Sequence, residues 1–327
     1  MKILLLSHES DIDGMGSVVL SKIVFGDIEY ELFPNVDELE LKVRKYIEDN
    51  YFDDFDTVYI TDLSLLRPAI DMVNDNESLK KKIKIFDHHQ RAIDDGLDKY
   101  DFSTVIERDE LGNKTCATSI FYNYLVKNKY LDENDTLKEF CELTRLEDTW
   151  SWEEKGDFGF KAHDLAILFS AIGKEKYIEK MVNKIKNNSL DFDTEDLDNI
   201  INKKTEYENK VREYINDSIY LYDEDNNKFG ITYAPYEYRN EITHKIINDG
   251  NKNDISYMIV VALDKGDFGQ KSYRKVKDDF DVNEVAKKYG GGGHPGAAGV
   301  YITKDQNEKS STMPKEDALK YLSTCSQ

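Results

Sequence analysis

The sequence is short of cysteine and of long apolar runs, and each shortage excludes a class of protein. Among 327 residues there are three cysteines, Cys116, Cys141 and Cys325, which lie far apart along the chain. An odd number of widely spaced thiols predicts a reducing, cytoplasmic setting, with no disulfide framework and no cysteine-based zinc site. The apolar runs span a handful of residues, whereas a membrane helix needs about 20. The first residues, MKILLLSHESD, hold one positive charge and four consecutive apolar residues, which argues against a signal peptide.

Positive charge is also in the minority. Lys and Arg total 44 and Asp and Glu total 65, which gives a formal net charge of −21. Such a chain repels long polyanions, so a groove for long duplex DNA is excluded unless the charge is strongly segregated. A short anionic substrate held through metal ions remains compatible with this charge. The 15 Phe and 21 Tyr supply enough bulk for globular cores, and the length predicts two domains of about 150 residues each.

The first half of the chain alternates apolar runs with helical patterns. Strands are predicted over residues 3–6, 28–33, 57–61 and 83–86, with helices over 14–25, 36–47 and from Pro68 onward. This alternation predicts an α/β fold with a largely parallel sheet and helices on both faces. Residues 115–187 are predicted to be mostly helical.

The second half begins with a highly charged stretch, residues 186–216, which predicts a linker with a solvated helix. Beyond it, strands are predicted near residues 229–234, 256–264, 268–274 and 297–302, and helices near 239–248 and 282–289. These elements predict a second, smaller α/β domain, followed by a polar tail and a short amphipathic segment. We therefore expect a larger domain over residues 1–187, a helical linker over 188–216 and a smaller domain over 217–327.

Acidic and imidazole side chains follow three of the predicted strands. In chain order these are His8, Asp11, Asp13, Asp62, Asp87, His88 and His89. The carboxyl ends of parallel strands meet at one edge of a sheet, where α/β folds place their sites. A further acid, Asp148, follows an amphipathic helix, where a negative charge opposes the helix dipole unless a cation neutralises it.

Taken one at a time, these acids also fit a plainer interpretation as helix caps or turn residues. Taken together, clustered carboxylates repel one another unless cations lie among them. Carboxylate and imidazole ligands without thiolate favour Mn²⁺, with Mg²⁺, Co²⁺ and Zn²⁺ as alternatives. Two such ions about 3.5–4 Å apart clamp a phosphoryl group and generate hydroxide from a shared water.

The predicted second domain carries four consecutive glycines, Gly290–Gly293, followed by His294. Glycines allow positive φ angles and a close approach to a ligand, so the N–H groups here are predicted to face an anion. A flexible surface loop is the alternative interpretation. Upstream, Ser272-Tyr273-Arg274 lies on a predicted strand, and residues 271–288 hold six basic and four acidic residues. Positive charge is therefore expected to gather around the glycine run.

Asp87-His88-His89 resembles the signature of the DHH phosphoesterases, and Gly290–Gly299 with Ser272-Tyr273-Arg274 before it resembles that of their DHHA1 domain. The resemblance covers residues 1 to about 150 and about 228 to 303, and the metal motifs fall in the family's order. It implies a parallel-sheet DHH catalytic domain and a smaller DHHA1 substrate-binding domain, with the active site in the cleft between them. The segment 115–118 is similar to the corresponding segment of the family's nano-RNases.

The resemblance further implies two divalent cations, most naturally Mn²⁺ with Mg²⁺ or Co²⁺ as alternatives. One ion would be held by His8 and Asp11, the other by Asp13, His88 and Asp148, with Asp62 bridging the two. His8 and Asp11 are separated by two residues, whereas a separation by three is common in the family. This departure weakens the assignment of His8, and the neighbouring Glu9 is an acid that would be able to substitute for it or supplement it.

The remaining site residues implied by the resemblance bind and orient the substrate. His89 would face the substrate phosphate, and Asp87 would act as a nearby ligand or orient a histidine. The other end of the substrate would be held by Arg274, Gly291, Gly292, Gly293 and His294. Metal ions and positive charge in this one region are together enough for a substrate of two to five nucleotides.

The implied activity is an Mn²⁺-dependent phosphodiesterase that degrades oligonucleotides of two to about five nucleotides from an end, using a hydroxide activated by two metals. A phosphatase for 3′-phosphoadenosine 5′-phosphate (pAp) or a cyclic (di)nucleotide phosphodiesterase is the alternative on the same site. A non-catalytic nucleotide-binding protein is a third class, against which the complete ligand set argues. Neither long duplex nucleic acid nor a membrane is an expected partner, and the sequence leaves monomer and homodimer open.

Overall fold

The computed structural model describes residues 1–249 and 255–326 of the chain. The chain divides into two compact units, Met1–Lys203 and Lys204–Gln327. Among the described residues, every helix is too short or too polar to cross a lipid bilayer.

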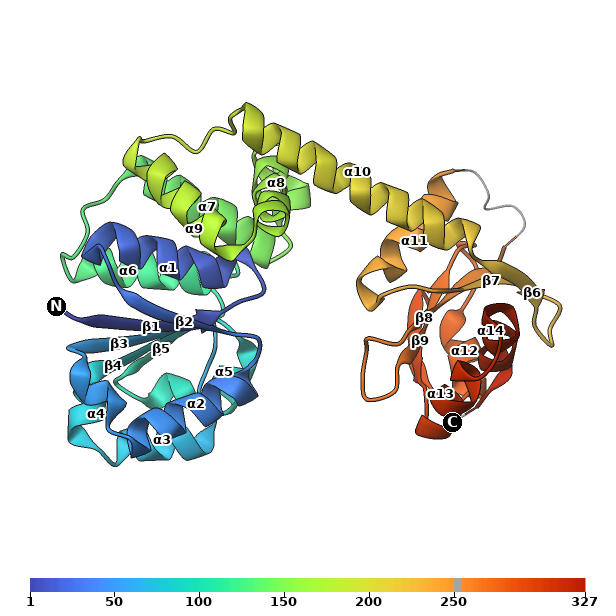
Figure 1. Ribbon diagram of the computed structural model, residues 1–327, viewed down its shortest axis with the longest axis horizontal. Helices are drawn as coiled ribbons and strands as arrows, with labels where there is room; N and C mark the ends of the chain where they lie inside the picture. The colour runs from blue at the N-terminus through green and yellow to red at the C-terminus, as the bar shows by residue number, and fades with distance from the viewer. Residues whose placement is uncertain (250–254, 327) are drawn as a thin grey trace. The chain divides into compact units, whose positions relative to one another are not determined.

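The first unit is built on a sheet of five strands in the order β2-β1-β3-β4-β5 (Figure 1). The strands are β1 (Ile3–His8), β2 (Glu29–Phe33), β3 (Thr57–Thr61), β4 (Ile83–Asp87) and β5 (Ser103–Val105). All neighbouring strands pair in parallel, which confirms the predicted parallel sheet. The sequence pattern predicts the first four strands but misses β5, because its three residues form no apolar run.

Helices cover both faces of this sheet. They are α1 (Ile12–Phe25), α2 (Val36–Glu48), α3 (Arg67–Asn74), α4 (Glu77–Lys82), α5 (Gln90–Asp94), α6 (Ala117–Lys127), α7 (Asp135–Asp148), α8 (Gly156–Ile172) and α9 (Lys174–Lys186). In β1, Ile3 and Leu5 face a core that includes α1, α6 and α7, while Leu4 and Leu6 face a second core with α2 and α3 (Figure 1). The strand is largely apolar because both of its faces are buried.

The second unit contains a sheet of six strands in the order β10-β11-β9-β8-β7-β6. They are β6 (Ile219–Tyr222), β7 (Lys228–Tyr233), β8 (Tyr257–Ala262), β9 (Gln270–Lys275), β10 (Gly292–His294) and β11 (Ala297–Tyr301). Only β7 and β8 pair in parallel among these described strands. The prediction of a second, smaller α/β unit is confirmed, although the sequence pattern did not indicate β6 or β10.

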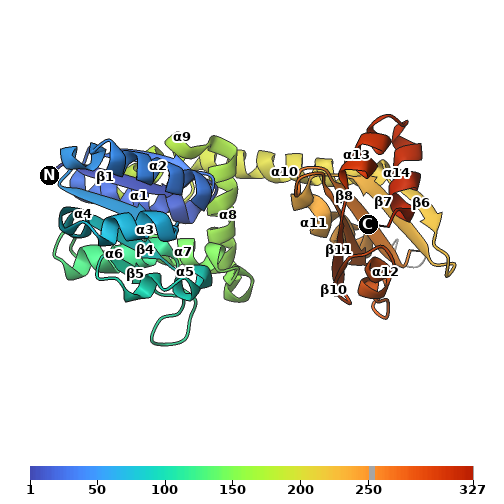
Figure 2. The same ribbon diagram turned by 90° about the horizontal axis from the view of Figure 1, so that it is seen from below.

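The helices of this part of the chain are α10 (Thr194–Asn216), α11 (Arg239–Asn248), α12 (Val282–Lys288), α13 (Lys304–Ser311) and α14 (Lys315–Thr324). Alternate residues of β8 face two cores, one shared with α12 and α14 and the other with α10 and α11 (Figure 2). The predicted polar tail after residue 303 is in fact the helix α13, because the Thr303 and Gln306 side chains form a capping box at its start.

The charged stretch predicted as a linker is largely the single helix α10. Most of its residues are exposed, but Ile200 packs into the core of the first unit and Val211 into a core of the second. At its start, the fully buried Asp196 forms ion pairs with Lys180 (2.5 Å) and Lys184 (2.7 Å) of α9. The limits 188 and 216 for a separate linker stay a prediction.

Candidate metal centre

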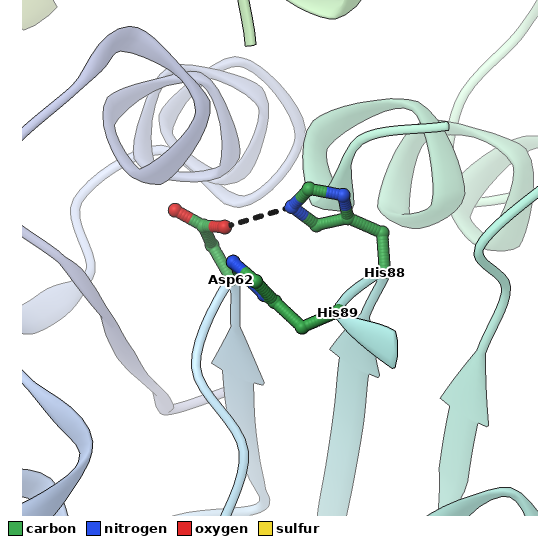
Figure 3. A group of neighbouring side chains, drawn as sticks. All are labelled: Asp62, His88 and His89. Carbon is green, nitrogen blue, oxygen red and sulfur yellow. Dashed lines mark ion pairs between the residues drawn. The ribbon is translucent and has the colours of Figure 1, made fainter. Parts of the chain in front are cut away.

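Three neighbouring strands of the first sheet bring polar side chains to one edge. His8 is the last residue of β1, Asp62 follows β3 directly, and Asp87 is the last residue of β4. The pairing of Ser7 with Thr61, and of Thr61 with Phe86, aligns these strand ends. Figure 3 shows Asp62 beside the two histidines that follow β4. The predicted gathering of side chains at this edge is therefore present.

Asp62 lies at the middle of the group. Its side chain is 2% exposed, with Oδ2 3.4 Å from His8 Nδ1 and Oδ1 3.4 Å from His88 Nε2. The two carboxylate oxygens thus face opposite histidines, as a shared ligand requires. The φ angle of Asp62 is +60°, a left-handed conformation that costs a residue with a side chain roughly 1–2 kcal/mol. Such strain is typical of functional sites, and here it turns the carboxylate into the group.

On one side of Asp62, His8 Nδ1 lies 2.8 Å from Asp11 Oδ2. The other oxygen of Asp11 accepts hydrogen bonds from the N–H groups of Asp13 and Gly14, both at 3.1 Å, and caps α1. Asp11 is thus the helix cap that its sequence position allows and also a member of the group. The bond to Asp11 and the nearby carboxylate of Asp62 raise the pKa of His8 to about 10.

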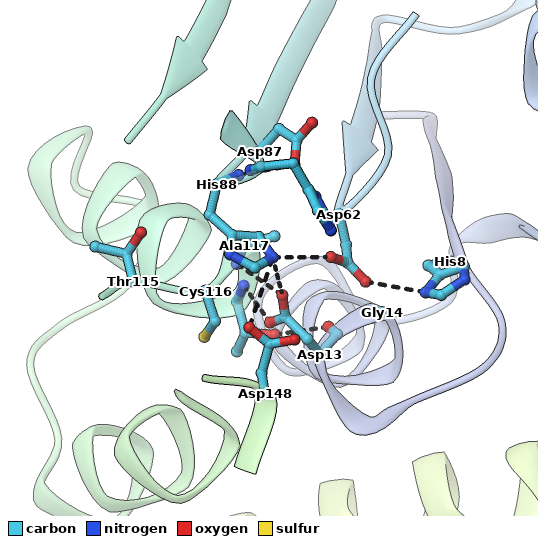
Figure 4. A network of polar contacts seen from close by, with 12 residues as sticks. His8, Asp13, Gly14, Asp62, Asp87, His88, Thr115, Cys116, Ala117 and Asp148 are labelled. Carbon is cyan, nitrogen blue, oxygen red and sulfur yellow. Dashed lines mark hydrogen bonds and ion pairs between the residues drawn. The ribbon is translucent and has the colours of Figure 1, made fainter. Parts of the chain in front are cut away.

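On the other side, His88 Nε2 lies 3.8 Å from Asp13 Oδ2 and 3.6 Å from Asp148 Oδ2 (Figure 4). Asp13 is fully buried and accepts hydrogen bonds from the N–H groups of Ala117 (2.7 Å) and Thr118 (2.8 Å). These N–H groups form the start of α6, whose dipole favours a negative charge. The 115–118 segment therefore holds and orients Asp13.

The Asp87 carboxylate bonds to the ring of His89. Its Oδ1 accepts the backbone N–H groups of His88 and His89 and lies 2.7 Å from His89 Nδ1, while the hydroxyl of Ser64 bonds to its other oxygen. Burial by itself raises the pKa of Asp87, but the bonds from His89 and Ser64 hold it below its usual value. The His89 side chain is 54% exposed. Asp87 thus orients a ring whose other edge is open to a substrate.

The group has the properties of a cation site. Within the described residues, Asp62 Oδ2, His88 Nε2 and Asp148 Oδ2 are buried and have no hydrogen-bond partner. Burial, together with the negative charge of Asp13, raises the pKa of Asp62 well above its usual value and that of Asp148 to about 8. Cations would satisfy these orphaned atoms and remove the repulsion between the acids.

The potential ligand atoms form three sets, and within each set the atoms lie within 4.8 Å of one another. They are His8, Asp11 and Asp62; Asp13, His88 and Asp148; and Asp62, His88 and His89. The first two sets flank the carboxylate of Asp62, so the residues present fit two divalent cations that share this carboxylate. Glu9 lies outside these sets, because its carboxylate pairs with Lys174 at 2.5 Å. It does not replace His8.

A family model for the DHHA1 domain matches residues 226–316. Over 314 aligned residues the chain is 30% identical to Oligoribonuclease NrnB of Bacillus subtilis (strain 168), and the alignment covers 93% of this chain and 74% of that protein. The chain belongs to the DHH family of phosphoesterases. It is therefore a phosphoric ester hydrolase.

Solved structures share this DHH-family fold. One is the DHH domain of a member of a family of ribosomal proteins, with a TM-score of 0.56, 14% identity, and coverage of 100% of this chain and 87% of that chain. Another is the exonuclease RecJ bound to manganese, with a TM-score of 0.52, 14% identity, and coverage of 98% and 93%. At this level of identity the likeness establishes the fold alone.

In the DHHA1 part of the chain, Arg274 lies on β9 and is half-buried. Its Nε donates to Asn240 Oδ1 and its Nη1 to the carbonyl oxygen of Tyr273, both at 2.9 Å. His294 ends β10 and is exposed. The structure thus leaves both side chains accessible on the second unit.

The glycine run forms part of a hairpin, in which β10 pairs with β11. The Gly291 N–H donates to the carbonyl of Ala286 at 3.0 Å, and the Gly293 N–H donates to Asn283 Oδ1 at 2.9 Å. The prediction that these two N–H groups face an anion is therefore wrong. A Cβ on Gly291 would lie 2.1 Å from the Gly299 carbonyl oxygen, so packing within the hairpin requires this glycine, whereas Gly292 is exposed.

Arg239, which the sequence pattern did not indicate, lies beside Arg274. The Arg239 guanidinium carbon is 3.7 Å from the centre of the Tyr236 ring, and its Nε is buried without a hydrogen-bond partner in the described residues. Lys265 Nζ lies 4.7 Å from the same ring. Burial and the charge of Arg239 lower the pKa of Arg274. Arg239 carries no motif, so only its place in the fold identifies it.

Proposed function

We propose that this DHH phosphoesterase is an Mn²⁺-dependent phosphodiesterase that degrades oligonucleotides of two to about five nucleotides from an end. The observation that carries the proposal is the position of Asp62, whose two oxygens face the two flanking ligand sets. The name of the oligoribonuclease relative supports the substrate class, and the manganese in the RecJ structure supports the metal. The three cysteines are free thiols, in keeping with a cytoplasmic location.

His8 and Asp11 would hold one divalent cation and Asp13, His88 and Asp148 the other, with Asp62 shared. When bound, two divalent cations polarise a phosphoryl oxygen and lower the pKa of water so that a nucleophile exists at neutral pH. The chain itself fixes the ligands before the substrate arrives: the start of α6 holds Asp13, and the start of α1 holds Asp11. Such preorganisation lowers the cost of reaching the transition state.

His89 is the residue we assign to the substrate phosphate. Asp87 fixes Nδ1 of its ring, which leaves Nε2 at the exposed edge. The bond to Asp87 also raises the pKa of His89, which favours a protonated ring that donates to a phosphoryl oxygen. Asp87 therefore acts as the orienting residue, and His89 as the group that meets the charge of the substrate.

Arg274 and Arg239 are assigned to a second phosphate or a terminal phosphate of the substrate. Guanidinium groups bind phosphate oxygens in pairs, and these two lack a carboxylate partner within the described residues. Their combined charge is unusual in a chain with a net charge of −21. Exposed His294 and Gly292 are the remaining candidates from the glycine run.

The test is an activity panel with Mn²⁺, Mg²⁺ or excess chelator. The substrates are pAp, linear dinucleotides, five-mers and twenty-mers of RNA and DNA, cyclic dinucleotides and pyrophosphate. We expect the highest kcat/KM with Mn²⁺ and the dinucleotides. Fastest turnover of pAp, or of a cyclic dinucleotide, would instead assign the alternative activity to the same centre. Full activity in the chelator would contradict the role of the metal.

A further inference from the structure

Both tryptophans of the chain closely follow Asp148, a residue of the candidate metal centre, in the sequence. Trp150 and Trp152 are two and four residues after Asp148, and Phe158 and Phe160 follow in the next turns. Trp150 is 66% exposed and Phe160 is 54% exposed. We call Trp150, Trp152 and Phe160, whose rings contact one another in turn, the aromatic platform. Trp150 thus lies just beyond the end of α7, whose last residue is Asp148.

The backbone at Trp150 is strained. The N–H of Trp150 donates to the carbonyl of Glu147 (3.0 Å) and that of Ser151 to the carbonyl of Leu146 (2.8 Å), which is the pattern of a Schellman motif at the end of α7. Trp150 has a φ angle of +57°, at the position where glycine is usual. Ending the helix does not require a bulky side chain at this position. The helix end therefore does not explain why the residue here is a tryptophan.

The platform has a rigid base. Trp152 stacks on His163 with ring centres 4.2 Å apart and an interplanar angle of 12°. His163 Nδ1 lies 3.2 Å from both carboxylate oxygens of Glu147, the residue before Asp148. A Cβ on Gly159 would lie 1.8 Å from the carbonyl oxygen of Trp152, so α8 packs closely under this turn. The last turn of α7 thus carries both a predicted metal ligand and the anchor of the platform.

The rings are arranged edge to face or tilted rather than as a parallel stack. The ring centre of Trp152 is 6.0 Å from that of Trp150 at an interplanar angle of 65°, and 6.0 Å from that of Phe160 at 56°. The exposed Trp150 ring therefore keeps surface that no neighbour covers. The acidic residues Glu153, Glu154 and Asp157 follow it closely in the sequence. These acids repel phosphate but leave an uncharged flat ring unaffected.

We propose that the aromatic platform stacks a nucleobase of the substrate, next to the phosphate held at the metal centre. This inference rests on the proposed function for its choice of ligand. Stacking accepts any base, because every base has a π face, so the platform supplies affinity without sequence preference. It complements Arg274 and Arg239, which bind charge rather than bases.

Intrinsic fluorescence provides a direct test, because the platform holds both tryptophans of the chain. The Mn²⁺-loaded protein is titrated with AMP and, in parallel, with ribose 5-phosphate, with excitation beyond the absorption band of adenine. We expect AMP at millimolar concentrations to quench the emission and ribose 5-phosphate to leave it unchanged. Equal responses to both ligands, or no response to AMP, would overturn the inference.

The kinetic test compares Trp150→Ala with Trp150→Phe and with Tyr222→Ala, a control at a side chain that is 64% exposed on the second unit. Trp150→Ala should raise the KM for a dinucleotide about tenfold, the effect of losing one stacked base. On a dinucleotide with an abasic residue at the platform end, Trp150→Ala should have the same KM as the wild type. Trp150→Phe should restore most of the affinity. Equal losses on both substrates would contradict stacking.

Trp150→Gly separates binding from folding. Glycine relieves the positive φ angle, so this variant should melt about 2–4 °C higher than wild type while binding the dinucleotide as weakly as Trp150→Ala. A lower melting temperature with normal KM would show a structural role and overturn the inference. So would a dimer that Trp150→Ala dissociates, since the platform would then face a second copy. If wild type hydrolyses no oligonucleotide, the proposed function fails, whereas the quenching by AMP still decides the stacking.

Discussion

The candidate metal centre of the first unit and the arginine pair of the second, Arg239 and Arg274, carry opposite charges. In the metal centre, acids gather at the carboxyl ends of parallel strands, and Asp13 and Asp62 are almost fully buried. In the arginine pair, two cations lie side by side within a chain whose net charge is −21. The contrast shows that a strongly negative net charge argues against long polyanionic partners but does not determine the charge of a local site.

The two regions also differ in what keeps them intact. Buried carboxylates that face each other carry a large desolvation cost, which only protons or cations offset. Arg274, by contrast, is satisfied by an asparagine oxygen and a carbonyl oxygen and keeps a path to solvent. Loss of a shared metal ligand should therefore disturb the whole centre. Loss of an arginine should remove one binding interaction and leave the rest in place.

The largest effect is expected from Asp62→Ala. Because this carboxylate faces both ligand sets, its loss should lower kcat on a dinucleotide by at least about 1,000-fold and reduce the bound metal. Steady-state kinetics and metal analysis of the purified variant measure the two effects. Asp191→Ala, at a side chain that is 90% exposed, is the matched control. Activity within about tenfold of wild type would show that Asp62 does not bridge the ions.

Arg274→Ala should act on one substrate more than on another. We expect kcat/KM for a dinucleotide to fall about 100-fold, because a charge-assisted bond to phosphate is lost. Bis-p-nitrophenyl phosphate has no second nucleotide, so its hydrolysis should fall far less, and the metal content should stay at the wild-type level. Arg67→Ala, at a side chain that is 68% exposed, is the control.

Two results with Arg274→Ala would contradict the different roles assigned to the two regions. One is an equal loss on both substrates, which would place Arg274 in the chemical step. The other is loss of metal, which would show that the second unit supports the metal centre rather than the substrate.

Substrate length should have a smaller effect. At equal concentrations, a dinucleotide should turn over at least about tenfold faster than a twenty-mer, because the acidic surface repels a long polyanion. Raising the ionic strength should narrow this ratio by screening the repulsion. Initial rates at low and high salt measure both. Equal rates at low salt would contradict the short-substrate proposal and favour a processive nuclease.

The smallest effect concerns pH in the chelated protein. His8 and Asp148, with pKa values raised to about 10 and about 8, hold protons in the folded state that the unfolded chain releases at lower pH. The stability that they contribute is present at low pH and is lost as the pH rises from about 4 through 8 for Asp148, and from about 6.5 through 10 for His8. The chelated protein should therefore lose a few kcal/mol of stability between about pH 6 and 8.

Cations displace these protons, so the Mn²⁺-loaded protein should be less sensitive to pH. The difference in melting temperature between loaded and chelated protein is expected to widen as the pH rises. A gap that narrows instead would show that the acids of this centre are stable without cations. Asp62→Ala should make the stability of the chelated protein depend less on pH, because it removes one of the interacting acids.

Much of the first unit could be predicted from the sequence. Short runs rich in apolar residues mark β1, β3 and β4, since strands buried on both faces carry apolar side chains on both. Parallel pairing then dictates that His8, Asp62 and His88 share one edge. The family signature added roles that spacing alone left open between helix caps and metal ligands.

Only the tertiary structure decided which partner each side chain meets. The sequence places Glu9 as near to the centre as His8, but packing of the start of α9 brings Lys174 to Glu9 and withdraws it. The N–H groups that hold Asp13 come from residues more than 100 positions later in the chain.

The same holds for the features that no motif announces. Arg239 becomes a neighbour of Arg274 because α11 packs against β9. The glycine run forms part of a hairpin, and the N–H groups of Gly291 and Gly293 donate to residues of α12. The strain at Trp150 depends on where α7 ends. A sequence determines the order and periodicity of its elements through local propensity and burial. Contacts between distant residues depend on register and packing, which form only when the whole core is assembled.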